Sequence, residues 1–180
     1  MANGQYVESR EMAEKSLMLT DYAPGSATYA SLSFLNMLEE DWDAAIASSD
    51  NLRATRDQQL ALLDFIRAGD FEGGLQEVRR MAADPSILPA PFRSRHLLVL
   101  TALMDDPELV LELFHTINIP DGTLMAPIRE FWNEYGREVR QLEGYKEILE
   151  LAGLVDYYRA TGNWPDSCQP LEGNDDFECF

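Results

Sequence analysis

A short pattern recurs three times in this chain and limits its fold more strongly than any other property of the sequence. It occupies residues 40–46 (EDWDAAI), 69–75 (GDFEGGL) and, more loosely, 105–111 (DDPELVL). Each copy has an acidic turn, a bulky residue, another acid, and then small or apolar residues that open a helix. An apolar run that can form a preceding helix comes before each copy. The pattern predicts an all-α fold of stacked antiparallel helical hairpins.

The hairpins are expected at about 26–54, 55–84, 91–118 and 124–160, within a repeat domain covering residues 1–160. A further helix, Gln5 to Tyr22, precedes them and ends at Ala23-Pro24-Gly25. Residues 161–180 have no helical period and are rich in Gly, Pro, Asp and Asn, yet they also hold Trp164, Phe177 and Phe180. This mixture predicts an irregular C-terminal cap docked on the last helices. No run of alternating apolar and polar residues has the boundaries that are typical of a β-strand.

The spacing of the small residues supports this division into repeats. Ala45, Gly74 and Val110 occupy the same place in the three copies and lie 29 and 36 residues apart. These steps bracket the roughly 34-residue period of tetratricopeptide repeats. A small side chain there allows the two helices of a hairpin to approach closely.

Composition excludes several classes of protein. With 180 residues, 46% of them hydrophobic, the chain is long enough to bury a core. The formal net charge is −18, with acids spread over all thirds of the chain. Such a field repels phosphate backbones, so we expect no nucleic-acid partner. No stretch approaches the roughly 20 apolar residues of a membrane span, and residues 1–10 do not form a signal peptide. The chain as given predicts a cytoplasmic protein.

Residues 26–54 and 55–84 resemble the tetratricopeptide-repeat (TPR) family. Tyr29, Leu32 and Ala45 stand where the family favours an aromatic residue, a leucine and an alanine, and the family's second small residue falls on Ser33. In the second unit that position is Leu62, and the family's closing proline is missing from the first unit. The resemblance implies a TPR-like α-α superhelix that binds a protein or peptide partner, with a second copy of the chain as one candidate.

The C-terminal stretch carries a second resemblance. Residues 151–168 (LAGLVDYYRATGNWPDSC) and 175–179 (DDFEC) are similar to the end of bacterial signalling regulators in which TPR repeats follow a winged-helix or cyclase domain. The likeness implies a sensor or adaptor module of bacterial signalling. Those regulators often have a membrane span, so a periplasmic location is expected if this chain is a piece of such a protein.

Carried onto this chain, the family's groove falls on the first helix of each hairpin. The resemblance implies a partner groove with an apolar wall beside an arginine pair: Phe34, Met37, Leu38, Arg56, Gln59, Leu63, Ile66 and Arg67. Such a groove suits an amphipathic or acidic-tipped peptide. The alternative is that Phe34, Leu63 and Ile66 are covered by the N-terminal helix or by a second copy of the chain.

Nothing in the sequence indicates an enzyme, a cofactor or a metal. His96 and His115 are 19 residues apart and are read as helix-end histidines, and no Gly-rich loop precedes a lysine. The rival hypothesis is a helical small-molecule binder or enzyme with an aromatic pocket near the cap, formed by Trp132, Tyr157, Tyr158 and Trp164.

Two interpretations of Cys168 and Cys179 stay open. They can form a disulfide that closes the tail, which in the chain-entropy model contributes roughly 3 kcal/mol and requires an oxidising compartment. Alternatively, they are two reduced thiols packed beside Trp164 and Phe177. Two cysteines alone do not make a zinc site, because zinc takes four ligands.

Overall fold

The computed structural model describes residues 2–19, 27–51, 55–84, 86–87, 90–118, 128, 131–132, 134–173 and 175–180. These residues divide into two compact units, 1–89 and 90–180. The first unit is helical throughout its described part, whereas the second ends in a small β-hairpin. Of the described helices, none combines the length and apolar character that crossing a bilayer requires.

The first unit contains five helices that pack in chain order. They are α1 (Ala2–Leu19), α2 (Ala27–Leu38), α3 (Trp42–Ser49), α4 (Arg56–Ala68) and α5 (Phe71–Ala83). Each helix contacts the next, so that α2 lies between α1 and α3, and α4 lies between α3 and α5. This is the predicted arrangement of successive hairpins, α2 with α3 and α4 with α5. The predicted helix end at Ala23-Pro24-Gly25 lies outside the described residues.

The acidic turns of the hairpins share one local structure. The residue that leaves the first helix has a positive φ of 59° at Glu40, 69° at Gly69 and 61° at Asp105. The next residue, an aspartate in all three turns, caps the second helix, because its carboxylate accepts a hydrogen bond from the backbone N–H three residues later. These bonds are 3.1 Å, 3.0 Å and 2.9 Å long. The recurring sequence pattern is therefore a helix stop followed by a helix start.

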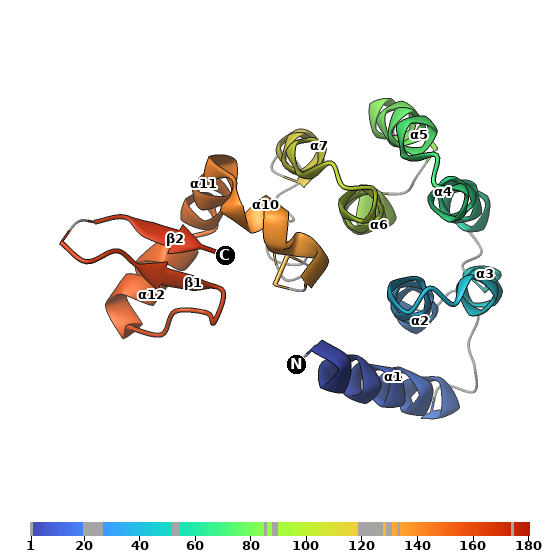
Figure 1. Cartoon of the computed structure of the whole chain (residues 1–180), viewed down its shortest axis with the longest axis horizontal. Coiled ribbons are helices and arrows are strands. Elements are labelled where there is room, and N and C mark those ends of the chain that lie inside the picture. The colour runs from blue at the N-terminus through green and yellow to red at the C-terminus, as the bar shows by residue number, and fades with distance from the viewer. Residues whose placement is uncertain are drawn as a thin grey trace. The chain divides into compact units, whose positions relative to one another are not determined.

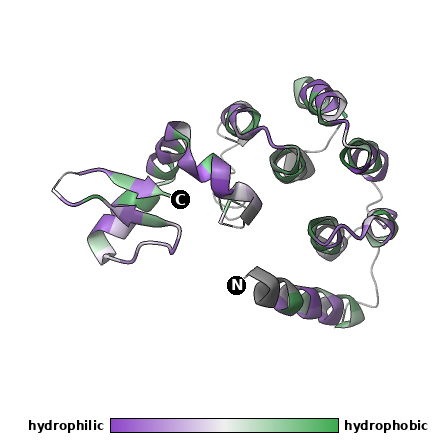
Figure 2. Cartoon of the chain, in the orientation of Figure 1, coloured by the Kyte–Doolittle hydropathy of each residue, from purple (hydrophilic) through white to green (hydrophobic). Residues whose placement is uncertain are grey.

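Small and apolar side chains form the core of the first unit. Ala45 and Val78 are fully buried, and Gly74 of α5 is buried as well. Figure 2 shows hydrophilic and hydrophobic residues mixed along these helices, as expected when one face of each helix packs on its neighbours. The other buried apolar side chains are Leu17, Leu32, Phe34, Leu35, Met37, Leu62, Leu63 and Met81.

A buried polar network crosses from the first hairpin to the second. The Ser33 and Ser49 hydroxyls are 2.9 Å apart, and both lie within hydrogen-bond distance of the Ala45 carbonyl. The Gln59 Nε2 of α4 donates to the Ser33 Oγ at 2.9 Å. The Gln59 Oε1 is buried and has no hydrogen-bond partner among the residues that the structure describes. Hydrogen bonds of this kind fix the relative positions of α2, α3 and α4 more specifically than apolar contact alone.

The second unit begins as a third hairpin and then changes character. It starts with α6 (Ala90–Leu103) and α7 (Pro107–Leu113), and α7 runs on into a π-helical turn, η1 (Phe114–Asn118). A 3₁₀ turn, η2 (Glu134–Gly136), leads into α10 (Arg137–Gln141), α11 (Glu143–Leu151) and α12 (Leu154–Thr161). Two antiparallel strands, β1 (Cys168–Pro170) and β2 (Phe177–Cys179), follow.

Three sequence predictions need correction here. The fold is mostly helical rather than wholly α, because the tail forms the β1–β2 hairpin. The predicted fourth pair, 124–160, is broken into short helices, since Leu142 adopts an extended conformation with ψ of 141° between α10 and α11. The second helix of the hairpin predicted at about 26–54 ends earlier than expected, at Ser49. Much of the beginning of the predicted pair 124–160 lies outside the described residues.

Candidate functional site

The predicted partner groove divides into buried and accessible residues. Phe34, Met37, Gln59 and Leu63 are at most 6% exposed, because α2 and α4 each pack between two neighbouring helices. These four side chains belong to the core of the first unit and cannot touch a partner in this conformation. Leu38 and Ile66 are half-buried, and Arg56 and Arg67 are exposed. The accessible surface of the predicted groove is therefore limited to these four residues.

The two groove arginines differ in their surroundings. Arg56 forms ion pairs with Asp50 at 2.7 Å and with Asp57 at 3.0 Å. Hydrogen bonds to these two carboxylates raise the pKa of Arg56 above its ordinary value. Arg67, near the end of α4, has no ion pair or hydrogen bond from its side chain within the described part of the chain. In a protein with 32 acids and 14 bases, an exposed unpaired arginine is a distinctive feature.

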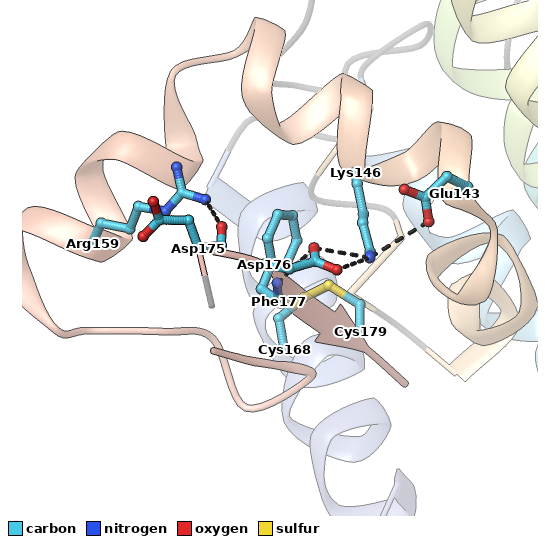
Figure 3. A network of polar contacts seen from close by, with 8 residues as sticks. All are labelled: Glu143, Lys146, Arg159, Cys168, Asp175, Asp176, Phe177 and Cys179. Atoms are coloured by element: carbon cyan, nitrogen blue, oxygen red, sulfur yellow. Dashed lines mark hydrogen bonds and ion pairs between the residues drawn. A yellow bond between two sulfur atoms is a disulfide. The ribbon is translucent and has the colours of Figure 1, made fainter. Parts of the chain in front are cut away.

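Cys168 and Cys179 are joined by a disulfide in the structure. They stand opposite each other in the β1–β2 pairing, with their Cα atoms 4.0 Å apart. The residue pairs that complete the hairpin are Gln169 with Glu178 and Pro170 with Phe177. Among the residues described, there is no free cysteine. The bond ties the two strands together directly beside Phe177, as Figure 3 shows.

Charged side chains from three helices hold this hairpin. The buried Arg140 of α10 donates from Nε to the Phe180 carbonyl at 2.9 Å and from Nη1 to the Phe131 carbonyl. Lys146 of α11 lies between the carboxylates of Glu143 and Asp176, at 3.4 Å and 3.1 Å. Figure 3 shows this bridge and the hydrogen bond from Arg159 to the Asp175 carbonyl. The hairpin is thus bound to α10, α11 and α12 by specific polar contacts.

The aromatic residues predicted to line a pocket instead pack against one another. The rings of Tyr158 and Trp164 are 5.4 Å apart, as are those of Trp164 and Phe177. Tyr157 is 55% exposed and Trp132 is 41% exposed. Packing of the hairpin on α12 accounts for the aromatic content of the tail.

Sequence reasoning missed the interior of the second unit around Tyr145 and Arg140. Tyr145 is fully buried, with its ring 6.0 Å from Phe131, and burial raises the pKa of its hydroxyl well above the usual range. Arg140 is buried although arginine is rarely found inside proteins. Two of its partners are the backbone carbonyls of Phe131 and Phe180, and a backbone partner leaves no charge pattern in the sequence. No signal in the sequence alone identifies this contact.

An open cleft of about 280 Å³ is a second feature that the sequence did not indicate. It lies between the α6–α7 turn and α10. Its lining consists of Ala102, Asp105, Pro107, Tyr135, Arg137, Glu138 and Val139. The mixture of acids, one arginine and a phenol is suited to a small polar ligand.

His115 is half-buried in η1, and the His96 side chain lies outside the described residues. Within the residues that the structure describes, no group of three or more His, Cys, Asp or Glu side chains could hold a metal ion.

Comparison with known proteins found no significant match of the chain to any protein-family model, curated protein or solved structure. The resemblance to TPR proteins therefore remains a prediction from the sequence.

Proposed function

We propose that this chain is a protein-interaction module that works as a sensor or adaptor in bacterial signalling. The observation that carries the proposal is the repetition of one hairpin unit, closed three times by a left-handed residue and an aspartate cap. Tandem helical hairpins present extended surfaces and commonly bind protein segments. The likeness of residues 151–179 to the end of bacterial regulators supports the assignment to signalling.

We place the partner surface on α2 and α4, at the accessible residues of the predicted groove. Leu38 of α2 and Ile66 of α4 are half-buried, and Arg67 of α4 is an exposed cation without an ion pair in the described residues. A short amphipathic segment with an acid at one end fits these three residues, because its apolar side chains cover Leu38 and Ile66 while its carboxylate meets Arg67. The field of the surrounding acids disfavours more strongly anionic ligands.

A charge-reversal experiment tests this surface. The tagged chain is incubated with host-cell extract, and proteins bound in saturable, near-stoichiometric amounts are identified and titrated against the pure chain. We expect Arg67→Glu to weaken binding of the identified partner about tenfold or more, since it removes a charge-assisted contact. Lys15→Glu on the exposed face of α1 is the matched control, with the same change of net charge.

Equal loss of binding in both variants would show that the partner senses only overall charge. Unchanged binding in both would remove α2 and α4 from the interface.

The cleft beside Tyr135 supports a second candidate function, the binding of a small polar molecule. Native mass spectrometry after incubation with the low-molecular-weight fraction of the extract tests it. A stoichiometric adduct that is lost in Glu138→Trp, which fills the cleft from its exposed side, would favour this function over the partner surface.

A further inference from the structure

The disulfide joins two strands that have few other bonds to each other. Among the described residues, three residue pairs form the β1–β2 ladder, and Pro170 has no N–H to donate. One side-chain hydrogen bond also joins the strands, from Gln169 Nε2 to the Glu178 carboxylate at 2.6 Å. Flanking hydrogen bonds run from the Phe180 N–H to the Ser167 carbonyl and from the Leu171 N–H to the Asp176 carbonyl, both 2.9 Å long. A two-stranded hairpin of this size is at best marginally stable in water without further support. The covalent bond is therefore a principal constraint on the hairpin.

The remaining support comes from a small number of contacts with the helices. Phe177, 1% exposed, is the deeply buried apolar anchor of β2. The Lys146–Asp176 ion pair is partly solvated, with 51% of the Asp176 side chain exposed, and such pairs contribute little. Arg140 holds the Phe180 carbonyl. These contacts favour docking of the β1–β2 hairpin on the helices. The order of the hairpin itself depends on the loop that the Cys168–Cys179 disulfide closes.

We propose that the Cys168–Cys179 disulfide is a redox-controlled clasp whose reduction releases the β1–β2 hairpin from α10, α11 and α12. Closing a loop of this length shifts the opening equilibrium by roughly 100-fold in the chain-entropy model, and reduction removes that shift. The clasp goes beyond the proposed function and does not rest on the partner surface of α2 and α4.

Release of the hairpin changes the exposed surface of α12. Phe177 packs on Trp164, and Trp164 packs on Tyr158, which is 6% exposed in the closed state. When β2 leaves, Trp164 loses its contact with Phe177, so the aromatic stack that rests on α12 is uncovered on that side, near the already exposed Tyr157. Reduction therefore converts a packed cap into an exposed aromatic surface.

The reductant is a dithiol, and the exchange balances without any other reactant. One thiolate of the dithiol attacks a sulfur of the Cys168–Cys179 bond, forms a mixed disulfide and displaces the other cysteine as a thiolate. The second thiol of the reductant then attacks the mixed disulfide, giving an oxidised dithiol and two reduced cysteines. Two electrons and two protons pass from the dithiol to the protein. Cys179 is the more exposed cysteine, 9% against 4% for Cys168, and is the expected point of attack.

Hydrogen exchange of the full chain, oxidised or treated with excess dithiothreitol under native conditions, tests the clasp. We expect amide exchange in 175–180 to accelerate roughly 100-fold on reduction, while α4 and α5 keep their protection. The double variant Cys168→Ser, Cys179→Ser should exchange like the reduced protein and should not respond to dithiothreitol.

Three outcomes would overturn the proposal. The first is that the fully reduced protein keeps the exchange protection of the oxidised hairpin. The second is that dithiothreitol leaves the disulfide intact until a denaturant is added. The third is that α6 and α7 lose protection together with the hairpin, because the disulfide would then be a general staple of the second unit. Hydrogen exchange of the reduced wild-type protein tests the proposal even if the double variant fails to fold.

Discussion

The helical hairpins and the C-terminal β-hairpin are held together by different kinds of interaction. Each helical hairpin is closed by two residues adjacent in sequence, one with a positive φ and an aspartate that caps the second helix. The β-hairpin depends on a disulfide, on Arg140 reaching a residue 40 positions away, and on rings from two separate segments. Interactions between residues close in the sequence thus hold the helical hairpins (the local region), and contacts between distant residues hold the C-terminal β-hairpin (the long-range region).

The largest expected effect tests the long-range region. A Cβ at Gly136 would lie 2.4 to 2.7 Å from backbone atoms of Phe131, the residue whose carbonyl accepts from Arg140. Because backbone cannot move aside as a side-chain end can, Gly136→Ala should lower the free energy of unfolding by about 3 kcal/mol. Urea denaturation measures this change.

The matched control for that substitution is Gly144→Ala in α11. Its new Cβ would meet only the Leu111 Cδ1, at 3.0 Å, which can shift. We expect a change within about 1 kcal/mol, because alanine also favours the helix. Similar losses for the two variants would mean that the contact with Phe131 is not the cause.

A smaller effect tests the local region. Asp70→Ala removes the cap of α5 and should cost about 1 kcal/mol of unfolding free energy. Asp64→Ala removes an acid from an exposed position within α4 and is the control for charge. Thermal and urea unfolding of both variants compare the two, and an equal response would assign the effect to charge rather than to capping.

The turn position with a positive φ gives a substitution that should raise the free energy of unfolding instead of lowering it. Glu40 has a φ of 59°, which costs a non-glycine residue energy, whereas the same place in the next turn is already Gly69. Glu40→Gly should stabilise the chain by about 0.5 kcal/mol, after the entropy of glycine in the unfolded chain is subtracted. Gly69→Ala should destabilise it. A loss of stability in Glu40→Gly would show that the Glu40 side chain contributes something the turn geometry does not require.

The smallest effect is a pH dependence that differs between the two regions. The Phe177 N–H and Lys146 lower the pKa of Asp176 below its ordinary value of 3.8, and Arg80 lowers the pKa of Glu77 within α5. A lowered folded pKa means that the stabilisation is present above the unfolded pKa and is lost as the pH falls through the folded value. NMR titration should show Asp176 returning toward 3.8 in Lys146→Gln, with Glu77 unchanged. An unchanged Asp176 titration would assign its shift to the backbone alone.

Sequence analysis predicted the local region well for a physical reason. The bounds of α5 and the start of α4 agree with the recurring sequence pattern. The reason is that the residues that end one helix, cap the next and set its apolar period lie within a few positions of one another. The predicted groove residues said less about which side chains are accessible to a partner. Phe34 and Leu63 follow the repeat pattern, but whether such positions face a partner or a neighbouring helix depends on the packing of α1 and α3.

The second unit was harder to predict because its decisive contacts are distant in sequence. The break at Leu142, the burial of Arg140 and the short strands each follow from tertiary packing rather than from residue preference. A three-residue strand that contains Pro170 has no recognisable alternation. The two cysteines left both redox states open, since spacing alone does not decide which one forms.

The buried network of Ser33, Ser49 and Gln59 makes the hairpins non-interchangeable. The positions that correspond to Ser33 and Ser49 are Leu62 and Val78 in the second hairpin, and Leu98 and Phe114 in the third, all buried. If a second copy of hairpin 55–84 replaced the first hairpin, Leu62 of that copy would lie against the amide of Gln59 and leave that amide without its hydrogen bond. The order of the repeats is thus encoded in their interior. Duplication or shuffling of single hairpins would require compensating substitutions at these matched positions.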